Sequence, residues 1–304
     1  MDLRLLGLAA IFYPTKPLPH PSATSTCYGA AVVHSSYAPG QGREPPEIDT
    51  SVPNSARIWN YWLGGKDNYP VDRAAGDEYR AIYPEIVDVA RASRRFLARA
   101  VRYLAGEAGV RQFLDIGTGL PTVDNTHEVA ERVADDVRVV YVDNDPVVLA
   151  HARALLTSAR AATAYVDADL HDPDRILAAA GRTLDLSRPV ALMLLGILGH
   201  IEDDDEARAI VARLLDALPS GSYLTICEGT NDHYETGVEA QRQYNESGAA
   251  PYRLRSARQV AEFFEGLELV EPGVVSCPRW RPDPGDRRAA LAEMDQVAGV
   301  GRKP

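Results

Sequence analysis

The chain has 304 residues and carries 43 acidic against 32 basic side chains, so its formal net charge is −11. This length allows one large α/β domain or two small domains. The excess of acidic side chains argues against nonspecific electrostatic binding to nucleic acid, because Lys and Arg contacts with phosphates supply most of that affinity. The three cysteines, Cys27, Cys227 and Cys277, lie far apart. They exclude a disulfide framework and any C-x-x-C metal site, and they favour a reducing, cytoplasmic location.

The first 48 residues are predicted to form a disordered extension. Residues 13–48 are rich in Pro, Ser, Gly and Ala, and such a segment buries too little apolar surface to offset its ordering entropy. The start, MDLRLLGLAAIF, is similar to a short signal peptide, but no small-x-small cleavage site follows it directly. No run of 18 apolar residues occurs in the chain, so we expect no transmembrane helix and no membrane partner.

Order is expected to begin near Asp49, and residues 85–104 are predicted to form a helix, because apolar side chains recur there at helical spacing. From residue 111 to residue 283, short apolar runs alternate with helical patterns. The expected strands cover 111–116, 138–142, 164–166, 189–195, 222–227, 267–270 and 273–277, and the expected helices include 147–159, 202–218 and 259–264. This alternation predicts a doubly wound, mainly parallel α/β sheet. Residues 284–304 are expected to form a C-terminal helix or tail.

Open α/β sheets bind ligands outside the carboxyl ends of their strands. Three aspartates stand at such ends: Asp115, which opens the Gly117-Thr118-Gly119 loop, Asp143 and Asp169. A single aspartate of this kind is more often a helix cap or a solvated turn. Three in succession, each after its own strand, predict a ligand that contains a nucleoside.

The glycine loop argues against a nicotinamide dinucleotide. The third glycine of the dinucleotide fingerprint is replaced by Thr122, and Pro121 lacks an N–H that a pyrophosphate could use. The carboxylate of Asp115 would also repel a diphosphate, whereas it suits a ligand that carries an ammonium and a sulfonium.

Three motifs resemble those of class I S-adenosylmethionine-dependent methyltransferases: Leu114-Asp-Ile-Gly-Thr-Gly119, Val142-Asp-Asn-Asp-Pro146 and Ala168-Asp169. Two longer segments are similar to the actinobacterial S-adenosyl methyltransferase family, formerly a family of unknown function. These segments are 53–68, PNSARIWNYWLGGKDN, and 263–275, FFEGLELVEPGVV. The resemblance covers residues 49–283. It implies a seven-stranded Rossmann-like sheet at 111–283, an N-terminal helical lid at 49–110, and S-adenosylmethionine as the cofactor.

The resemblance also implies roles for individual residues. Asp115, Gly117 and Gly119, with Thr118 between the glycines, would hold the methionine end of the cofactor. Asp143 would hold the ribose, with Asn144 against the adenine, and Asp169 with the Leu170 backbone would read the adenine edge. Arg57 lies in the lid segment, where it could meet the cofactor carboxylate bidentately. The alternative for this segment is an amphipathic helix that packs its aromatic side chains on the sheet.

His200, just past the fourth expected strand, is the best-placed candidate for a general base, because an imidazole can accept a proton near neutral pH. The alternative is a structural histidine bonded to a neighbouring loop. Glu228 and His233 are weaker candidates for the base. His127 is expected at the surface. The cluster Arg91, Arg94, Arg95 and Arg99 is expected to form a solvated helix face.

These observations favour a methyltransferase that acts on a small-molecule O or N acceptor. A cofactor-binding regulatory or scaffold protein without turnover stays open as the alternative, and a nicotinamide-dependent oxidoreductase is disfavoured by the glycine loop. We expect a small-molecule substrate and no nucleic-acid partner, with a homodimer left open. Neither the acceptor nor its reacting atom can be derived from residue spacing.

Overall fold

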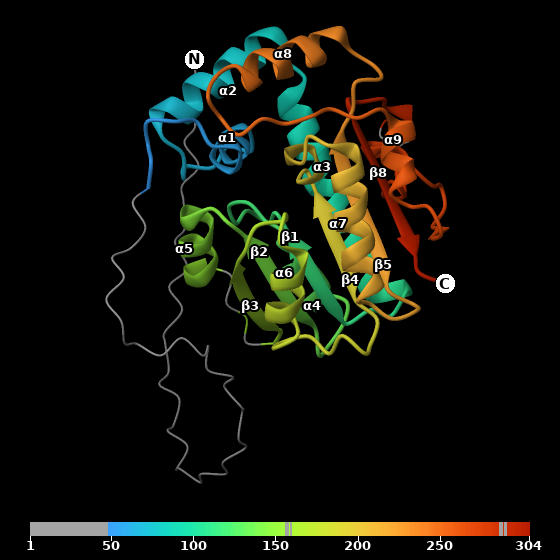
Figure 1. The fold of residues 1–304 in the computed structure, drawn as a ribbon. Helices are drawn as coiled ribbons and strands as arrows, with labels where there is room; N and C mark the ends of the chain where they lie inside the picture. The colour runs from blue at the N-terminus through green and yellow to red at the C-terminus, as the bar shows by residue number, and fades with distance from the viewer. Residues whose placement is uncertain (1–47, 156–157, 159, 286–287, 289–290) are drawn as a thin grey trace, which may run out of the picture. The chain divides into compact units, whose positions relative to one another are not determined.

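The computed structural model describes residues 48–155, 158, 160–285, 288 and 291–304, so all but the last residue of the predicted 1–48 extension lies outside the described residues. The described chain folds around an eight-stranded sheet in the order β3-β2-β1-β4-β5-β8-β6, with β7 also paired to β8 (Figure 1). The strands are β1 (Gln112–Ile116), β2 (Arg138–Asp143), β3 (Ala162–Asp167), β4 (Ala191–Leu195), β5 (Tyr223–Gly229), β6 (Glu268–Leu269), β7 (Val275–Ser276) and β8 (Gln296–Arg302). Strands β1 to β5 are parallel, which confirms the predicted doubly wound α/β sheet.

Strand β8 corrects two predictions, because residues 296–302 belong to the sheet and not to a helix or tail. The strand runs antiparallel between β5 and β6, so the α/β domain extends past residue 283 and has eight strands instead of seven. Its glycines hide it in the sequence, since strands are normally depleted in glycine. They are needed by the packing: a Cβ on Gly299 would lie 2.9 Å from Val274, and one on Gly301 would lie 2.8 Å from Phe264.

Helices cover both faces of the sheet. One face packs against α6 (Pro173–Ala180), α7 (Asp204–Asp216) and α9 (Ala257–Glu262), and the other packs against α3 (Ile86–Arg102) and α4 (Thr126–Glu131). Successive strand residues alternate between the two layers, so that Phe113 joins one apolar cluster and Leu114 the other. Burial on both faces explains the continuous apolar runs from which the strands were predicted. Helix α5 (Pro146–Leu155) follows β2, and the π-helical turn η1 (Tyr103–Glu107) extends α3.

A helical cap lies over the carboxyl ends of the strands (Figure 1). It consists of α1 (Ser55–Trp62), α2 (Pro70–Ile82) and α8 (Glu235–Asn245), which share one apolar cluster with the first turns of α3. The predicted lid at 49–110 therefore covers only part of the cap, because α8 comes from the chain between β5 and α9. None of the described helices is long and apolar enough to cross a membrane.

Candidate functional site

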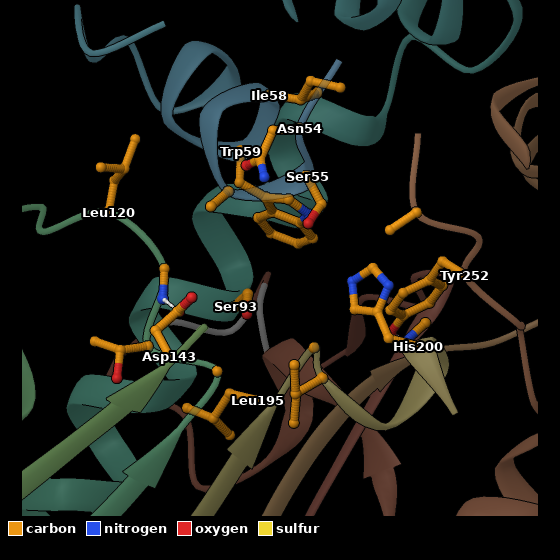
Figure 2. A pocket seen from close by; sticks show the side chains of 18 of the residues that line it. Asn54, Ser55, Ile58, Trp59, Ser93, Leu120, Asp143, Leu195, His200 and Tyr252 are labelled. Atoms are coloured by element: carbon orange, nitrogen blue, oxygen red, sulfur yellow. Dashed lines mark hydrogen bonds between the residues drawn. The ribbon is translucent and has the colours of Figure 1, made fainter. Parts of the chain in front are cut away.

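One cavity of about 430 Å³ lies between the carboxyl ends of the strands and the cap (Figure 2). Nine of the ten predicted site residues line it, and Arg57 is the exception. The nine residues are Asp115, Gly117, Thr118, Gly119, Asp143, Asn144, Asp169, Leu170 and His200. The structure thus brings together residues that lie up to 85 positions apart in the chain, as the strand-end argument predicts.

The glycine loop turns sharply over the end of β1. Gly117 and Gly119 have φ angles of 74° and 65°, in the left-handed region that favours glycine. A Cβ on Gly117 would lie 2.7 Å from the side chain of Ile197, so the position also needs glycine for space. The Gly119 N–H donates to Asp143 Oδ2 at 2.9 Å and joins the loop to the end of β2 (Figure 2).

Asp115 is 5% exposed and accepts a hydrogen bond of 2.6 Å from the Thr126 hydroxyl. Burial is the largest influence on its carboxyl group and raises the pKa to about 6, against the opposing effects of Thr126 and the nearby Arg94 guanidinium. This carboxylate therefore lacks a full counter-charge in the folded protein, and a cation bound beside it would be stabilised.

Asp143 and Asp169 differ in how their oxygens are occupied. Burial raises the pKa of Asp143, although the N–H groups of Asp145 and Gly119 both donate to it. The pKa of Asp169 is lowered overall. Burial alone would raise it, but hydrogen bonds from His171 and Asn144 outweigh the effect of burial. Asn144 Nδ2 lies 2.8 Å from Asp169 Oδ2. Asp169 therefore remains ionised, and Asn144 is oriented by it.

Arg57 does not line the cavity, which contradicts the predicted contact with a ligand carboxylate. Its side chain is 3% exposed and forms an ion pair of 3.0 Å with Asp72 at the start of α2. Its Nη1 and Nη2 atoms donate to the backbone carbonyls of Asp49 at 3.0 Å and Val52 at 2.7 Å. Each end of the guanidinium is thus engaged within the cap, where Arg57 ties α1 to α2.

Arg94 on α3 lines the cavity, whereas Arg57 does not. It is the only Arg or Lys among the described residues that line the cavity, and its Nη2 donates to the carbonyls of Val123 and Asp124. Its Nε is buried and has no hydrogen-bond partner among the described residues. Arg99, one turn and a half further along, is buried instead of solvated and donates to the carbonyls of Trp280 and Cys277.

His200 ends the short 3-10 turn η2 (Leu198–His200) that follows β4. Its Nδ1 lies 2.9 Å from the carbonyl oxygen of Pro251. A carbonyl only accepts, so Nδ1 carries the proton and the neutral ring keeps its lone pair on Nε2. No described residue forms a hydrogen bond with Nε2. Burial lowers the pKa of His200, which keeps the ring neutral near pH 7.

The weaker candidates for a base are not free to act in the cavity. Glu228 is buried and accepts from the backbone N–H groups of Ile197, Leu198 and Gly199, and from the Tyr252 hydroxyl. His233 does not line the cavity. His127, predicted at the surface, is buried, and its Nδ1 lies 2.8 Å from the Tyr141 hydroxyl.

No individual role was predicted for several cavity residues that come from the cap and from the chain at the start of β8. These are Trp59, Trp62, Tyr79, Tyr83, Tyr244, Asp295 and Gln296. The only signal for them is the aromatic content of residues 59–83; Asp295 and Gln296 were hidden by the missed strand.

A profile of the S-adenosyl methyltransferase family matches residues 41–304. The chain belongs to the S-adenosyl methyltransferase family. Two solved structures resemble this methyltransferase closely. A DUF574 family protein from Streptomyces avermitilis is 48% identical, covers 85% of this chain and 100% of its own, and has a TM-score of 0.79. A methyltransferase candidate from Thermobifida fusca is 42% identical, covers 85% of this chain and 98% of its own, and has a TM-score of 0.78. No curated protein matches the chain.

The family match, with the strand-end site, confirms the predicted S-adenosylmethionine-dependent methyltransferase and its cofactor. The α/β sheet, the strand-end aspartates and the glycine loop are consistent with this enzyme class. The matched residues 41–304 include β8, so the family unit extends past the predicted boundary at residue 283.

Proposed function

We propose that this methyltransferase transfers a methyl group to an O or N atom of a small molecule, and that His200 acts as the general base. The observation that carries the proposal is the contact of His200 Nδ1 with the Pro251 carbonyl at 2.9 Å. Because the carbonyl can only accept, Nδ1 donates, and the lone pair of Nε2 is available at the cavity. A base so placed could accept a proton from the acceptor, and such assistance contributes about 10²–10⁴-fold in rate.

The charged groups of the cavity fit S-adenosylmethionine. When bound, this cofactor supplies a methyl group on a positively charged sulfur. Arg94, with its unpartnered Nε, would take the cofactor carboxylate, and Asp115 would take the ammonium. Arg94 and Asp115 lie close enough for each to affect the pKa of the other. Such proximity is needed if they are to bind the carboxylate and the ammonium of one amino-acid group.

The strand-end carboxylates would orient the nucleoside. Asp143 keeps accepting capacity beyond its two backbone donors, because an ionised carboxylate offers about four lone-pair sites. It would accept from the ribose hydroxyls. Asp169 and Asn144 would meet the adenine. Asn54 donates to Asp145 Oδ2 at 2.6 Å and joins the cap to the loop after β2, so the cap can exclude water from this end.

The transfer needs alignment more than activation by the protein, because the sulfonium is already reactive. Holding the acceptor in line can supply roughly 7–11 kcal/mol of the barrier in favourable cases. The cap and the turn at His200 would provide this alignment.

The test is transfer of tritiated methyl to a panel of small phenols, alcohols and amines by the full-length protein, with the products identified by mass spectrometry. We expect at least one acceptor, and we expect His200→Gln to reduce transfer while cofactor affinity is retained. Binding of S-adenosylmethionine without transfer to any acceptor would favour the regulatory or scaffold alternative. Full activity of His200→Gln would remove the general base from the proposal.

A further inference from the structure

The cap side of the cavity is a chamber with aromatic walls. Its rings form a chain of edge-to-face contacts: Trp59 to Trp62 at 5.9 Å, Trp62 to Tyr79 at 5.2 Å, and Tyr79 to Tyr244 at 6.2 Å between ring centroids. Tyr83 extends the wall. These residues come from α1, α2 and α8 and the loop after α2, so the chamber exists only because the three cap helices pack together.

A buried carboxylate stands at this chamber. Asp295, just before β8, is 7% exposed and lines the cavity. Its Oδ1 accepts from the N–H of Tyr234 at 3.2 Å, at the start of α8. Its Oδ2 is buried and has no hydrogen-bond partner among the described residues; the Tyr83 hydroxyl is near it but not in hydrogen-bond geometry. Burial raises the pKa of Asp295 and outweighs the opposing effects of the Tyr234 N–H, of His233 and of the Tyr83 hydroxyl.

Besides Arg94 Nε at the glycine loop, three more buried polar atoms of lining residues have no hydrogen-bond partner in the described part of the chain. They are the hydroxyls of Tyr83 and Tyr244 and the Oε1 atom of Gln296. Unpaired polar atoms in a buried position are costly, and they are normally satisfied by a ligand or water. With Asp295 Oδ2, the chamber holds four such atoms. Asp295 Oδ2 and Gln296 Oε1 can only accept a hydrogen bond, so a ligand that satisfies them has to donate.

The charge of the cavity selects among possible partners. Arg94 is the only Arg or Lys among the described lining residues, and it lies beside Asp115 at the glycine loop. A carboxylate or phosphate in the chamber would therefore meet Asp295 without a cation to balance it. An ammonium offers three donors and a positive charge, and the faces of tryptophan and tyrosine attract such a charge.

We propose that the methyl acceptor is a small organic ammonium, held in this chamber by Asp295 and by the aromatic walls. The inference rests on the proposed function in one respect, since it takes the chamber as the acceptor side of the methyltransferase site. The ammonium is the anchoring group of the acceptor, and it selects amine-bearing molecules over alcohols and acids of the same shape.

The experiment titrates the full-length protein, saturated with S-adenosylhomocysteine, with three probes of similar shape: phenethylamine, 2-phenylethanol and 3-phenylpropanoate. Calorimetry should show phenethylamine binding at least about tenfold tighter than the alcohol, and the carboxylate weakest. Asp295→Asn should bring the amine-to-alcohol ratio close to one, because Asn retains the Oδ1 acceptor for Tyr234 but loses the charge.

Glu293→Gln is the matched control. Glu293 lies two positions before Asp295, is exposed and pairs with Arg279, but it does not line the cavity. The amine preference should therefore persist in this variant. Unchanged affinity for S-adenosylhomocysteine shows that each variant is folded.

Binding without amine preference, binding of none of the probes, or an amine preference that survives Asp295→Asn would overturn the inference while leaving the cofactor site intact. If S-adenosylhomocysteine itself did not bind, the proposed arrangement of the cofactor would fail, and the inference would fail with it. Since the probes measure binding, loss of transfer in His200→Gln tests the general base independently of this inference.

Discussion

Gly199 lies directly against the ring of Tyr252: a Cβ at position 199 would be 2.3 Å from Tyr252 Cζ. The tyrosine hydroxyl reaches Glu228, which also accepts the N–H of Gly199 at 3.3 Å. The His200 ring packs edge-to-face on Tyr252 with 5.2 Å between the ring centroids (Figure 2). Its Nδ1 bonds to the carbonyl of Pro251. The missing side chain at 199 thus allows the contact that orients the candidate base.

Gly199→Ala should move Tyr252 and with it His200. Overpacking of this kind typically costs about 1–3 kcal/mol of stability, and we expect methyl transfer to fall more than affinity for S-adenosylhomocysteine. Chemical denaturation, calorimetry and transfer assays on the same variant check this. Gly106→Ala is the control, because a Cβ there would meet nothing closer than 3.9 Å. Equal transfer by Gly199→Ala and wild type would show that this packing does not orient His200.

The pH dependence of transfer should report His200. The pKa of this residue is lowered by burial, so kcat at saturating substrates should rise with pH through an inflection below the usual imidazole value and then level off. His200→Gln should reduce kcat by about 10²–10⁴-fold and remove this inflection. An inflection that persists in the variant would assign the titration to another group.

The pH dependence of cofactor binding should report Asp115, whose pKa is raised to about 6. Its carboxyl group is mostly protonated at pH 5 and mostly ionised at pH 7, so affinity for the cofactor ammonium should weaken by about tenfold between pH 7 and pH 5. The raised pKa stabilises the ligand-free fold at low pH, and this contribution is lost as the pH rises through about 6. Titration of Asp115→Asn should show a flat profile; a profile like that of wild type would refute the assignment.

The two arginines should separate stability from binding. Arg57→Met leaves Asp72 buried without its counter-ion, which should reduce the free energy of unfolding by about 3–5 kcal/mol. Arg94→Met should instead weaken binding of S-adenosylhomocysteine by about 1.5–3 kcal/mol, the range for a hydrogen bond to a charged group. Urea denaturation and calorimetry on both variants check the pair. The opposite pattern would return the cofactor carboxylate to Arg57.

The strand-end residues could be predicted from the sequence because their positions follow from topology alone. Asp115, Asp143 and Asp169 lie at or within two residues of the carboxyl ends of β1, β2 and β3, and parallel strands end at the same edge of a sheet. The burial of both sheet faces made those strands visible as apolar runs.

The arginines and the aromatic chamber could not be predicted in the same way. Whether Arg57 faces a ligand or a carboxylate depends on Asp72, on the next helix, and residue spacing does not report that contact. The chamber joins Tyr79 to Tyr244, which are 165 positions apart. Asp295 was missed because the glycines of β8 weakened the strand pattern that would have placed it in the sheet.

The most direct test of the cofactor site is calorimetric titration of the full-length protein with S-adenosylhomocysteine, for wild type, Asp143→Ala and Asp167→Ala. Asp167 also ends a strand, but it is exposed and does not line the cavity, so its variant is the matched control. We expect micromolar binding by wild type and Asp167→Ala, and binding weaker by about 1–3 kcal/mol for Asp143→Ala. Equal affinity of all three proteins, or no binding by wild type, would contradict the assignment of this cavity to the cofactor.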